Sequence, residues 1–538
     1  MRRWPTPFAI FSLEVERRVL IVTEPANYSP SAPVLAAGRS TMGELFRSRA
    51  AVRPDDIAVE DGKRRLTYGK LNERVNRLVQ VLSGTGVAHG DRVGLLARNC
   101  LEYLEVELAT AKLGAITAAL NWRLAGEELA HCINLTTPKV LLAQDDFADG
   151  LAKLELCDHR TLFIGDDYER ALAGASADEP AITVTPEDGL VILFTSGTTG
   201  LPKGAVVSHR AMIARAFAFT SELAIAPDEG FVAWAPFFHM ASTDHALATL
   251  IRGGKVIVID GFQADAMIDA ARRERIGWFV LIPGMVEQFI AAIDKTEGFE
   301  PRSIRVCGAM ADLVAPQQIA AVSKRLKAPY LNSFGATETG LPPATRHLIP
   351  MGEAPEALAK EQSSCCEIRL LDQDGNDVAE GEPGELAIKG PTLFSGYWNA
   401  DEANAKDFRG GWFHMGDIFR RLPNGRLEFV DRAKYMIKSG GENVYPAEIE
   451  RVLFAEPRVI EAAVVRAKDE KWGEAPVAFV CRSDATLGAD DLMMRCREAL
   501  AGYKRPREVR FIEFDDFPRS TTGKVQRHQL EALLEAEE

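Results

Sequence analysis

The chain has 538 residues, of which 46% are hydrophobic and 26% are charged, with 43 Gly and 28 Pro. This composition is that of an ordinary globular protein and excludes a collagen-like, disordered or disulfide-rich chain. The formal net charge of −14 disfavours a nucleic-acid partner, because binding a phosphate backbone requires a basic surface. The length exceeds what one typical core can serve, so we expect several lobes and a separable domain.

The eight cysteines show no CxxC spacing, which favours reduced thiols in a cytoplasmic protein. The apolar start of the chain is interrupted by Glu14, Glu16, Arg17 and Arg18. The uninterrupted run is therefore well short of the roughly 18 residues that span a membrane, and we expect no transmembrane segment. We assign no role to residues 1–40, an N-terminal extension, and the sequence leaves the oligomeric state undetermined.

Helical and strand-like segments alternate in the first half of the chain, which is typical of an α/β body. Helical spacing of apolar residues covers 66–82 and 101–114, with a short apolar strand at 90–97 between them. Further strands that are apolar at every position, as in a sheet buried on both faces, are predicted at 191–194, 255–260 and 278–283. Residues 145–188 are predicted to be a surface connection with short elements.

The second half of the chain changes character. The glycine turns in DQDGND, EGEPGE and LPNGRLEF indicate a β-rich lobe that ends near 431–434. The remaining residues alternate between helix and strand and suffice for a small α+β domain. Its predicted elements are the helix PAEIERVLFA, the strands AAVV and PVAFVC, the helix DDLMMRCREALA and the strand VRFIEF.

The segment TSGTTGLPKG, residues 195–204, carries the strongest chemical signal. It follows the apolar strand at 191–194, and a helix is predicted to begin near Ser208. Its glycines, hydroxyls and single lysine would present N–H groups, O–H groups and a cation to a chain of phosphates. It is not a Walker loop, because the spacing to Lys203 and the Gly204 that follows do not fit that motif. A flexible polar surface loop is the alternative.

This segment resembles the phosphate-binding signature of the adenylate-forming superfamily of acyl-CoA synthetases, peptide-synthetase adenylation domains and firefly luciferases. Other segments resemble further motifs of the superfamily in the same order, over about residues 42–530. They are PFFH at 236–239, NSFGATE at 332–338, GD at 416–417, DRAK at 431–434, GGEN at 440–443 with Pro446 and EIE at 448–450, and PRSTTGK at 518–524.

The resemblance implies an α/β fold with a large multi-lobed N-terminal domain and a small mobile α+β C-terminal domain. The large domain, residues 41–432, would contain two α/β sheets and a β-rich lobe. The C-terminal domain would be residues 433–538, with Lys434 at the pivot between two half-reactions.

The resemblance also implies that ATP activates a carboxylic acid as an acyl-adenylate. Attack on the α-phosphate leaves charge on phosphate oxygens, so cations and positioning would supply most of the catalysis. Lys524 would be a mobile catalytic cation, Lys203 a second one, and His239 would line the reacting centre. Glu338 and Thr195 would hold Mg²⁺, which commonly takes one or two carboxylates together with phosphate oxygens.

The ribose, the adenine and the acyl-phosphate each have candidate partners. The Asp417 carboxylate can accept hydrogen bonds from a diol, and Phe334 would offer a flat face to adenine opposite Gly308 and Ala309. Arg432 would meet the acyl-phosphate. The ATP- and AMP-binding candidates are Thr195, Ser196, Gly197, Thr198, Thr199, Gly200, Lys203, Gly308, Ala309, Asn332, Phe334, Gly335, Ala336, Thr337, Glu338, Asp417, Arg432, Lys434, Lys438 and Lys524.

The acyl acceptor and the acid are less closely defined by the residues. Ser439, Gly440 and Gly441 would let the pantetheine arm of CoA pass close to the backbone. The expected acyl pocket is mostly apolar or aromatic, which disfavours amino acids and fits a fatty, alicyclic or aromatic monocarboxylate. Its candidate residues are Trp234, Phe238, His239, Thr243, Met310 and Phe334.

The sequence therefore predicts an AMP-forming carboxylic acid:CoA ligase that uses ATP, CoA and Mg²⁺. An adenylating enzyme that transfers the acyl group to a carrier protein or another acceptor is the alternative. A non-catalytic nucleotide-binding protein is disfavoured, because the charged residues expected in the site are all present. Three positions depart from the superfamily pattern: Phe334 stands where Tyr is usual, Met415 where Thr is usual and Tyr435 where an acid is common. We expect these changes to weaken nucleotide binding without abolishing activity.

Overall fold

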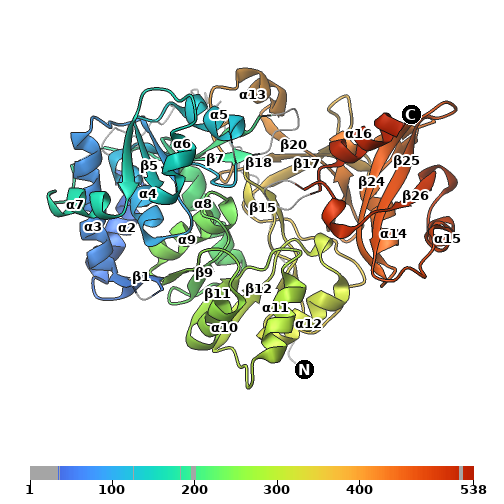
Figure 1. The fold of residues 1–538 in the computed structure, drawn as a ribbon, viewed down its shortest axis with the longest axis horizontal. Coiled ribbons are helices and arrows are strands. Elements are labelled where there is room, and N and C mark those ends of the chain that lie inside the picture. Colours follow the sequence, from blue (N-terminus) through green and yellow to red (C-terminus); the bar gives the residue numbers. More distant parts are fainter. Residues whose placement is uncertain are drawn as a thin grey trace, which may run out of the picture. The chain divides into compact units, whose positions relative to one another are not determined.

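A computed structural model describes residues 34, 37–62, 64–124, 126–181, 183–195, 201–440, 442–519 and 525–537. The predicted site residues Ser196 to Gly200, Gly441 and Lys524 lie outside this described part of the chain. The chain separates into two units, residues 1–39 and 40–538, and the fold below is that of the second unit (Figure 1).

A six-stranded sheet forms the first layer of the body, and it is parallel except for its last strand. Its order is β6 (Arg160–Ile164), β5 (Val140–Gln144), β3 (Arg92–Leu96), β4 (Ile116–Ala119), β7 (Gly189–Thr195) and β8 (Lys203–Ser208). The helices of this region are α2 (Met42–Val52), α3 (Tyr68–Gly84), α4 (Leu101–Leu113), α5 (Glu127–Thr136), α6 (Ala148–Leu151) and α7 (Asp166–Ala173).

An eight-stranded sheet forms the second layer, parallel in its middle and antiparallel at both edges. Its order is β16 (Leu348–Ile349), β13 (Tyr330–Leu331), β12 (Ser303–Cys307), β11 (Arg275–Phe279), β9 (Gly230–Ala233), β10 (Val256–Val258), β1 (Ile57–Asp61) and β2 (Arg64–Thr67). The helices that accompany it are α8 (His209–Glu222), α9 (Met240–Arg252), α10 (Ala264–Arg273), α11 (Val286–Lys295) and α12 (Pro316–Leu326).

Antiparallel strands build the rest of the body. The hairpin of β14 (Phe334–Ala336) and β15 (Gly340–Ala344) stands apart from a five-stranded sheet. That sheet contains β17 (Glu367–Leu371), β18 (Pro383–Lys389), β20 (Trp412–Arg421), β19 (Phe408–Arg409) and β21 (Leu427–Arg432), and α13 (Asp401–Asp407) precedes β19. The predicted β-rich lobe is therefore present.

The C-terminal residues form a sheet of their own. Its strands are β23 (Glu442–Val444), β22 (Ile437–Ser439), β25 (Gly473–Arg482), β24 (Val459–Asp469) and β26 (Glu508–Phe511). The helices here are α14 (Pro446–Phe454), α15 (Ala489–Ala499) and α16 (Arg527–Glu537). Two apolar clusters in this part of the chain consist only of residues that follow 436. The division into domains at 432 and 433 stays a prediction.

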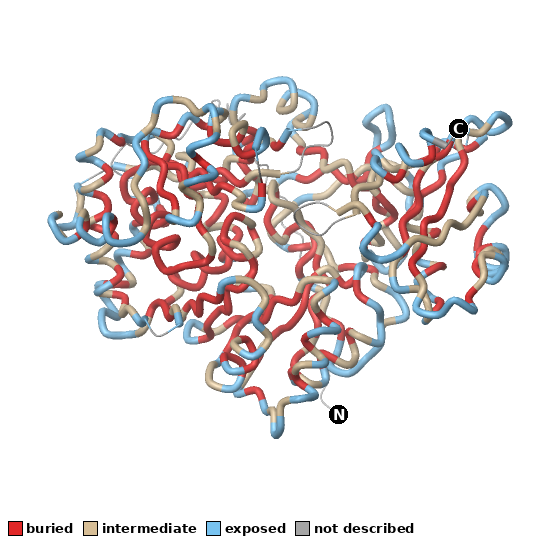
Figure 2. The backbone as a smooth tube through the Cα atoms, viewed as in Figure 1, coloured by how far each residue is buried: buried red, intermediate tan, exposed pale blue. Residues whose placement is uncertain are grey.

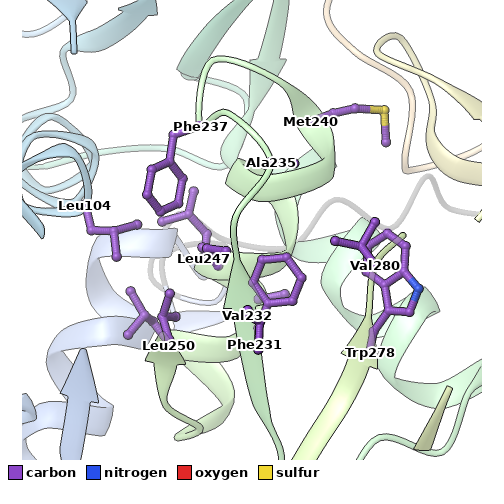
Figure 3. Packing of buried hydrophobic residues seen from close by; sticks show 14 of the residues in the cluster. Leu104, Phe231, Val232, Ala235, Phe237, Met240, Leu247, Leu250, Trp278 and Val280 are labelled. Atoms are coloured by element: carbon purple, nitrogen blue, oxygen red, sulfur yellow. The ribbon is translucent and has the colours of Figure 1, made fainter. Parts of the chain in front are cut away.

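Buried residues follow the strands and the helices between them (Figure 2). In the main core, Leu104 of α4 and Leu247 of α9 lie near Phe237, and Trp278 of β11 lies near Phe231 of β9 (Figure 3). The rings of Phe231 and Trp278 are stacked with centroids 6.1 Å apart. The main core thus contains residues of both large sheets and of the helices that accompany each of them. Among the described residues, no helix is both long and apolar enough to cross a bilayer.

The α/β fold with a β-rich lobe and an α+β C-terminal region is confirmed, but several predicted strand ends were wrong. The run at 255–260 is a strand only over Val256–Val258. The apolar run at 278–283 is a strand only as far as Phe279. The run VRFIEF leaves its strand at Phe511. The connection at 145–188 contains short elements as predicted, and one of them, β6, pairs with β5 at the edge of the six-stranded sheet. At 278–283 the apolar run reflects burial, which continues at Val280 and Leu281 past the end of β11.

Every residue of α4 is buried, including three glutamates. Glu102 pairs with Arg64 and Glu105 with Arg74, as expected for buried charges. Glu107 differs, because its partner is the neutral hydroxyl of Thr243, at 3.0 Å. Burial, with a further contribution from Asp244, raises the pKa of Glu107 to about 8. Glu107 is therefore protonated in the folded protein at neutral pH.

We predict that Glu107→Gln removes a pH dependence of stability. Between pH 4.5 and about 8 the folded protein keeps a proton on Glu107 that the unfolded chain releases. The free energy of unfolding of the wild type should therefore fall as the pH rises through this window, by about 1.4 kcal/mol per pH unit from this group. Gln retains an acceptor for Thr243 and carries no proton to lose. Urea unfolding at several pH values measures the difference.

The Glu107→Gln variant and the wild type should have equal stability below pH 4.5 and diverge above it, with the variant more stable. Glu402, exposed on α13, provides the control, because Glu402→Gln should leave the pH profile unchanged. Asp244 and Tyr103 face Glu107 and are the same in both proteins. Parallel profiles for wild type and Glu107→Gln would contradict the burial of a protonated carboxyl.

Candidate active site

The two ends of the predicted phosphate-binding segment lie on paired antiparallel strands. Strand β7 ends at Thr195 and β8 begins at Lys203, and these two residues are paired in the antiparallel ladder. The helix predicted to begin near Ser208 is confirmed as α8, and β8 lies between the loop and this helix. The Ser208 hydroxyl accepts the N–H of Ala211 and so caps this helix. The ladder brings the two ends of the loop together.

A segment from the β-rich lobe extends this pair of strands. Val206 and Trp398 donate backbone N–H groups to the carbonyls of Gly396 and Gly204, at 3.0 and 2.8 Å. The segment thus lies along β8, and its Tyr397 faces Lys203. The Lys203 Nζ lies 4.0 Å from the centroid of the Tyr397 ring and 3.8 Å from the Asp407 carboxylate. A cation over an aromatic ring is attracted to its electron-rich face.

Tyr397 connects Lys203 to Glu338. Its hydroxyl donates to Glu338 Oε1 at 2.7 Å. Burial and the neighbouring Glu338 raise the pKa of Tyr397, so the phenol keeps its proton and remains a donor. The carboxamide of Asn404 holds the backbone of Tyr397 on both sides, with its oxygen 2.7 Å from the N–H and its nitrogen 2.9 Å from the carbonyl. The Tyr397 ring is therefore fixed.

Glu338 lies between β14 and β15, and its backbone is also held. Phe394 donates its N–H to the Glu338 carbonyl at 2.9 Å. Glu338 is half-buried. Its carboxylate lies close enough to Arg432 that the negative charge helps raise the pKa of the Arg432 guanidinium. The structure thus brings together Lys203, Glu338 and Arg432, which are far apart in the sequence.

Asp417 and Arg432 form an ion pair across neighbouring strands. They are partners in the ladder of β20 and β21, and the Nε of Arg432 lies 2.8 Å from Asp417 Oδ1. Asp417 is only 1% exposed, and its charge is the main reason why the pKa of Arg432 is raised. Sequence analysis assigned these two residues to different parts of the nucleotide. In the structure, the ion pair between them fixes the orientation of both side chains.

Phe334 lies in an aromatic cluster beside this pair. Its ring stacks on Phe429 with centroids 5.5 Å apart and meets the edge of Phe419 at 4.8 Å. On the neighbouring strand end, Gly308 has φ +73°, and a Cβ there would lie 2.1 Å from the Tyr330 ring. A side chain at Gly308 is thus excluded twice, by backbone conformation and by contact. The Tyr330 ring thus explains the glycine, and the approach of adenine to Gly308 stays a prediction.

Asn332 has a different environment from the one expected of a nucleotide ligand. It is fully buried, and its amide nitrogen lies 2.9 Å from His347 Nδ1 and 3.0 Å from the Leu358 carbonyl. Its oxygen accepts from the buried Lys360, which also pairs with Asp312 at 2.5 Å. These contacts hold in place the segment that leads into β14. An ATP contact from Asn332 stays a prediction.

The acyl-pocket candidates lie around the start of α9. His239 caps that helix, with its Nδ1 accepting the N–H of Ala241 at 3.1 Å. Trp234 is buried and donates its indole N–H to the Val280 carbonyl at 2.8 Å. The Phe238 ring meets Trp122 edge-on at 6.4 Å. Thr243 is fully buried and donates to Glu107, so its place in an acyl pocket stays a prediction.

Met310 has a backbone conformation that is rare for its residue type. It follows Gly308 and Ala309 with φ +48°, in the left-handed region. A bulky non-glycine residue there costs free energy and persists only where its surroundings enforce it. The backbone therefore turns sharply where the expected adenine and acyl sites meet.

The candidates for the hinge and for CoA lie in the C-terminal sheet region. Lys434 has its Nζ 4.6 Å from the Tyr435 ring, and its carbonyl accepts from Arg466 at 2.5 Å. The backbone N–H of Lys438 donates to Glu474 at 2.8 Å, and Ser439 pairs with Gly473. Gly440 has φ +60°, and a Cβ there would lie 2.6 Å from Trp472. Both the positive φ and the Trp472 ring favour glycine at position 440.

Comparison with known proteins gives this arrangement a family. The profile of the AMP-binding enzymes matches residues 46–398, and the profile of their C-terminal domain matches residues 448–524. The chain belongs to the family of AMP-binding enzymes. The resemblance to the adenylate-forming superfamily, noted in the sequence, is thereby confirmed.

Relatives and solved structures match over nearly the whole chain. An indoleacetate–CoA ligase from Aromatoleum aromaticum is 34% identical over 507 residues, 92% of this chain and 98% of that protein. A feruloyl-CoA synthase from an Amycolatopsis species is 34% identical over 90% of this chain and 96% of that protein. The structure of ATP-bound MatB from Rhodopseudomonas palustris has a TM-score of 0.79 at 27% identity, over 92% of this chain and 99% of that one.

The predicted AMP-forming acid–CoA ligase is confirmed as the class of this enzyme, and its substrates include ATP and CoA. Transfer to a carrier protein is not favoured, because these curated relatives are CoA ligases and synthases. The roles of individual residues stay predictions. Tyr397 was missed by sequence reasoning, since an aromatic residue in FSGYWN looks like any core residue. The neighbouring Gly396 was the only local signal of an unusual turn.

We predict that Tyr397→Phe slows adenylate formation while leaving the ring beneath Lys203. The lost hydroxyl removes a hydrogen bond to the Glu338 carboxylate, and a bond to a charged group is worth about 1.5–3 kcal/mol. If this bond acts in the transition state, pyrophosphate release should slow by about 10- to 100-fold. The measurement is the rate of pyrophosphate release from ATP and an accepted acid.

The control is Tyr103→Phe. The buried Tyr103 hydroxyl has no hydrogen-bond partner within the part of the chain that the structure describes. Loss of that hydroxyl should leave the rate unchanged. Equal effects of the two substitutions, or no effect of Tyr397→Phe, would contradict a role for Tyr397 in adenylate formation.

Proposed function

We propose that this acid–CoA ligase activates an aromatic or arylalkanoic monocarboxylate and transfers the acyl group to CoA. The observation that carries the adenylate-forming step is the convergence of Lys203, Tyr397 and Glu338 at the paired ends of β7 and β8. The substrate class is supported by the names of two relatives, which act on indoleacetate and ferulate. Fatty and alicyclic acids are the alternatives.

The environment of Trp234 also favours an aromatic acid. Its ring meets Phe262 edge-on at 5.6 Å, and Phe262 in turn meets Phe289 at 6.4 Å. Aromatic walls provide edge-to-face and stacked contacts that a flat ring exploits better than an alkyl chain. Because Trp234, Phe238 and His239 occupy one continuous segment, such a ring would lie beside the start of α9.

In the first half-reaction, an oxygen of the substrate carboxylate attacks the α-phosphorus of ATP. The bond from that phosphorus to the bridging oxygen breaks, and pyrophosphate leaves with the electron pair. We assign Lys203 and Lys524 to the charge that develops on the phosphate oxygens, since fixed cations stabilise it most in the transition state. Phe334 and Gly308 would border the adenine, and Asp417 would accept from the ribose hydroxyls.

Glu338 and Thr195 suit Mg²⁺. The ion usually takes one or two carboxylates and leaves its other positions to phosphate oxygens and water. We propose that the ion binds together with the phosphates of ATP, which would supply its other oxygen ligands. When bound, Mg²⁺ neutralises phosphate charge. The bond from Tyr397 fixes one oxygen of Glu338 and so orients the carboxylate.

In the second half-reaction, the CoA thiolate attacks the acyl carbon and AMP leaves with the electron pair of the broken C–O bond. We assign Ser439, Gly440 and Gly441 to the passage of the pantetheine arm. Residues 433–538 would move about Lys434 between the two half-reactions. The separate sheet formed by residues after 436 supports treating this part as a domain.

We also propose that the enzyme is cytoplasmic and has no nucleic-acid partner. The eight cysteines are free thiols, which suits a reducing compartment, and the net charge of −14 disfavours a polyanion.

The test of the function is a panel of aryl, arylalkanoic, fatty and alicyclic acids, each mixed with ATP and Mg²⁺, with and without CoA. We expect pyrophosphate release with aryl or arylalkanoic acids, faster with CoA, and the matching thioester identified by mass spectrometry. Thioester formation confined to fatty acids would overturn the substrate class. Pyrophosphate release at the same rate with and without CoA would contradict CoA as the acyl acceptor.

We further predict that Lys524→Ala separates the two half-reactions. Adenylate formation should fall by orders of magnitude, because a cation is lost from the phosphoryl-transfer transition state. Thiolysis of a supplied acyl-adenylate by CoA should persist, since that step moves no phosphoryl group. Lys468→Ala, which removes an exposed lysine of β24, is the control. Equal losses in both half-reactions would contradict this division of roles.

A further inference from the structure

Helix α8 carries an arginine whose guanidinium lies inside the protein. The side chain of Arg215 is only 3% exposed. Its three nitrogens donate to three separate segments: Nη1 to Asp244 Oδ2 at 3.1 Å, Nη2 to the Thr337 carbonyl at 3.0 Å and Nε to the Thr392 carbonyl at 3.0 Å. Only a planar fork with several donors can satisfy such a set at once, so lysine is no equivalent.

Two of these acceptors flank Glu338 in space. Thr337 immediately precedes it, and Thr392 lies two residues before Phe394, whose N–H donates to the Glu338 carbonyl at 2.9 Å. Arg215 therefore holds the chain on both sides of the Glu338 backbone. The side chain of Glu338 is held separately, through Tyr397.

The loop after Glu338 is shaped around Arg215. Gly340 has φ +75°, and a Cβ there would lie 2.8 Å from Arg215 Cδ. The backbone can approach the arginine stem this closely only because Gly340 has no side chain, and the positive φ also favours glycine. The path of the chain from Glu338 back into β15 thus depends on the position of Arg215.

Asp244 fixes Arg215 from the opposite side. It is 3% exposed, its Oδ2 accepts from Arg215, and its Oδ1 has no hydrogen-bond partner among the described residues. A buried carboxylate with one charged partner holds that partner strongly, because separating them would leave a charge unpaired in a region of low dielectric. Asp244 belongs to α9, whose first turn is capped by His239.

We propose that Arg215 is a positioning residue that sets the Glu338 loop for nucleotide binding and links it to α9, the helix capped by His239. The inference rests on the proposed role of Glu338 at the magnesium and phosphate site. Arg215 touches no reacting atom, and it acts through the Thr337 and Thr392 carbonyls.

The first variant is Arg215→Lys, which keeps a charge opposite Asp244 and cannot reach all three acceptors. We expect pyrophosphate release to slow by about 10- to 100-fold, the scale of a misplacement of about 1 Å in a site. The Mg²⁺ concentration for half-maximal release should rise. Thiolysis of a supplied acyl-adenylate should stay at the wild-type rate, because that step needs no Glu338.

The matched control is Arg210→Ala on the same helix. Arg210 donates to the carbonyls of Pro391 and Leu393, next to Thr392, and pairs with Glu187 at 2.9 Å. Arg210 thus holds the same segment around Thr392 that Arg215 holds. The Mg²⁺ dependence should be unchanged in this variant. An Arg210→Ala shift equal to that of Arg215→Lys would overturn a specific role for Arg215.

A second variant separates positioning from stability. In Arg215→Met with Asp244→Leu, both members of the buried pair become apolar, so no unpaired charge remains inside and the fold is retained. This protein still lacks the donors to Thr337 and Thr392. We expect it to unfold at a temperature close to that of the wild type and to show the same defect in pyrophosphate release as Arg215→Lys. Wild-type release rates would overturn the proposal.

ATP binding provides a measurement that does not depend on finding the acid. Calorimetry with ATP, in Mg²⁺ and in EDTA, gives the factor by which Mg²⁺ strengthens binding. We expect this factor to be smaller in the double variant than in the wild type. An equal factor would overturn the role of Arg215. If the wild type forms no thioester from any acid, the proposed ligase function fails, and the binding factor still decides whether Arg215 positions the loop.

Discussion

The hydrogen bond of 2.7 Å from the Tyr397 hydroxyl to Glu338 joins two segments that reach β8 from different parts of the fold. One segment is the loop between β14 and β15, and the other runs antiparallel to β8. The bond places a half-buried carboxylate near a lysine and an arginine, Lys203 and Arg432. A neutral donor can hold a carboxylate in place without cancelling the charge that a cation or phosphate-bound metal would need. The nucleotide side of the site depends on this arrangement.

Sequence analysis was most successful where the chemistry is carried by short motifs at the ends of strands. A buried strand does lead into the segment that begins at Thr195, and a helix does begin near Ser208. Tyr397 and Arg215 could not have been selected, because their importance comes from partners far along the chain. An aromatic residue in a loop and an arginine on a helix are each common, and neither has a local pattern that distinguishes it. The contacts exist only once β8, α8 and α9 have packed.

The same limit explains the errors in the fold. The apolar run at 278–283 continues past the end of β11 because Val280 and Leu281 are buried without being laddered. Its Val280 carbonyl accepts from the indole of Trp234 at 2.8 Å, so a side chain replaces the neighbouring strand as a partner. The apolar spacing of α4 predicted the helix and left its three glutamates unexplained. The helix is buried on all sides, because Arg64 and Arg74 from neighbouring elements supply the opposite charges for Glu102 and Glu105.

The ion pair between Asp417 and Arg432 shows how strand register places a cation beside a buried carboxylate. Asp417 is only 1% exposed, and burying a carboxylate without a partner is costly. Arg432 supplies that partner because the two residues face each other in the ladder of β20 and β21. Because Arg432 is also the last residue of β21, the residue that secures Asp417 stands directly before the segment about which the C-terminal domain is proposed to turn.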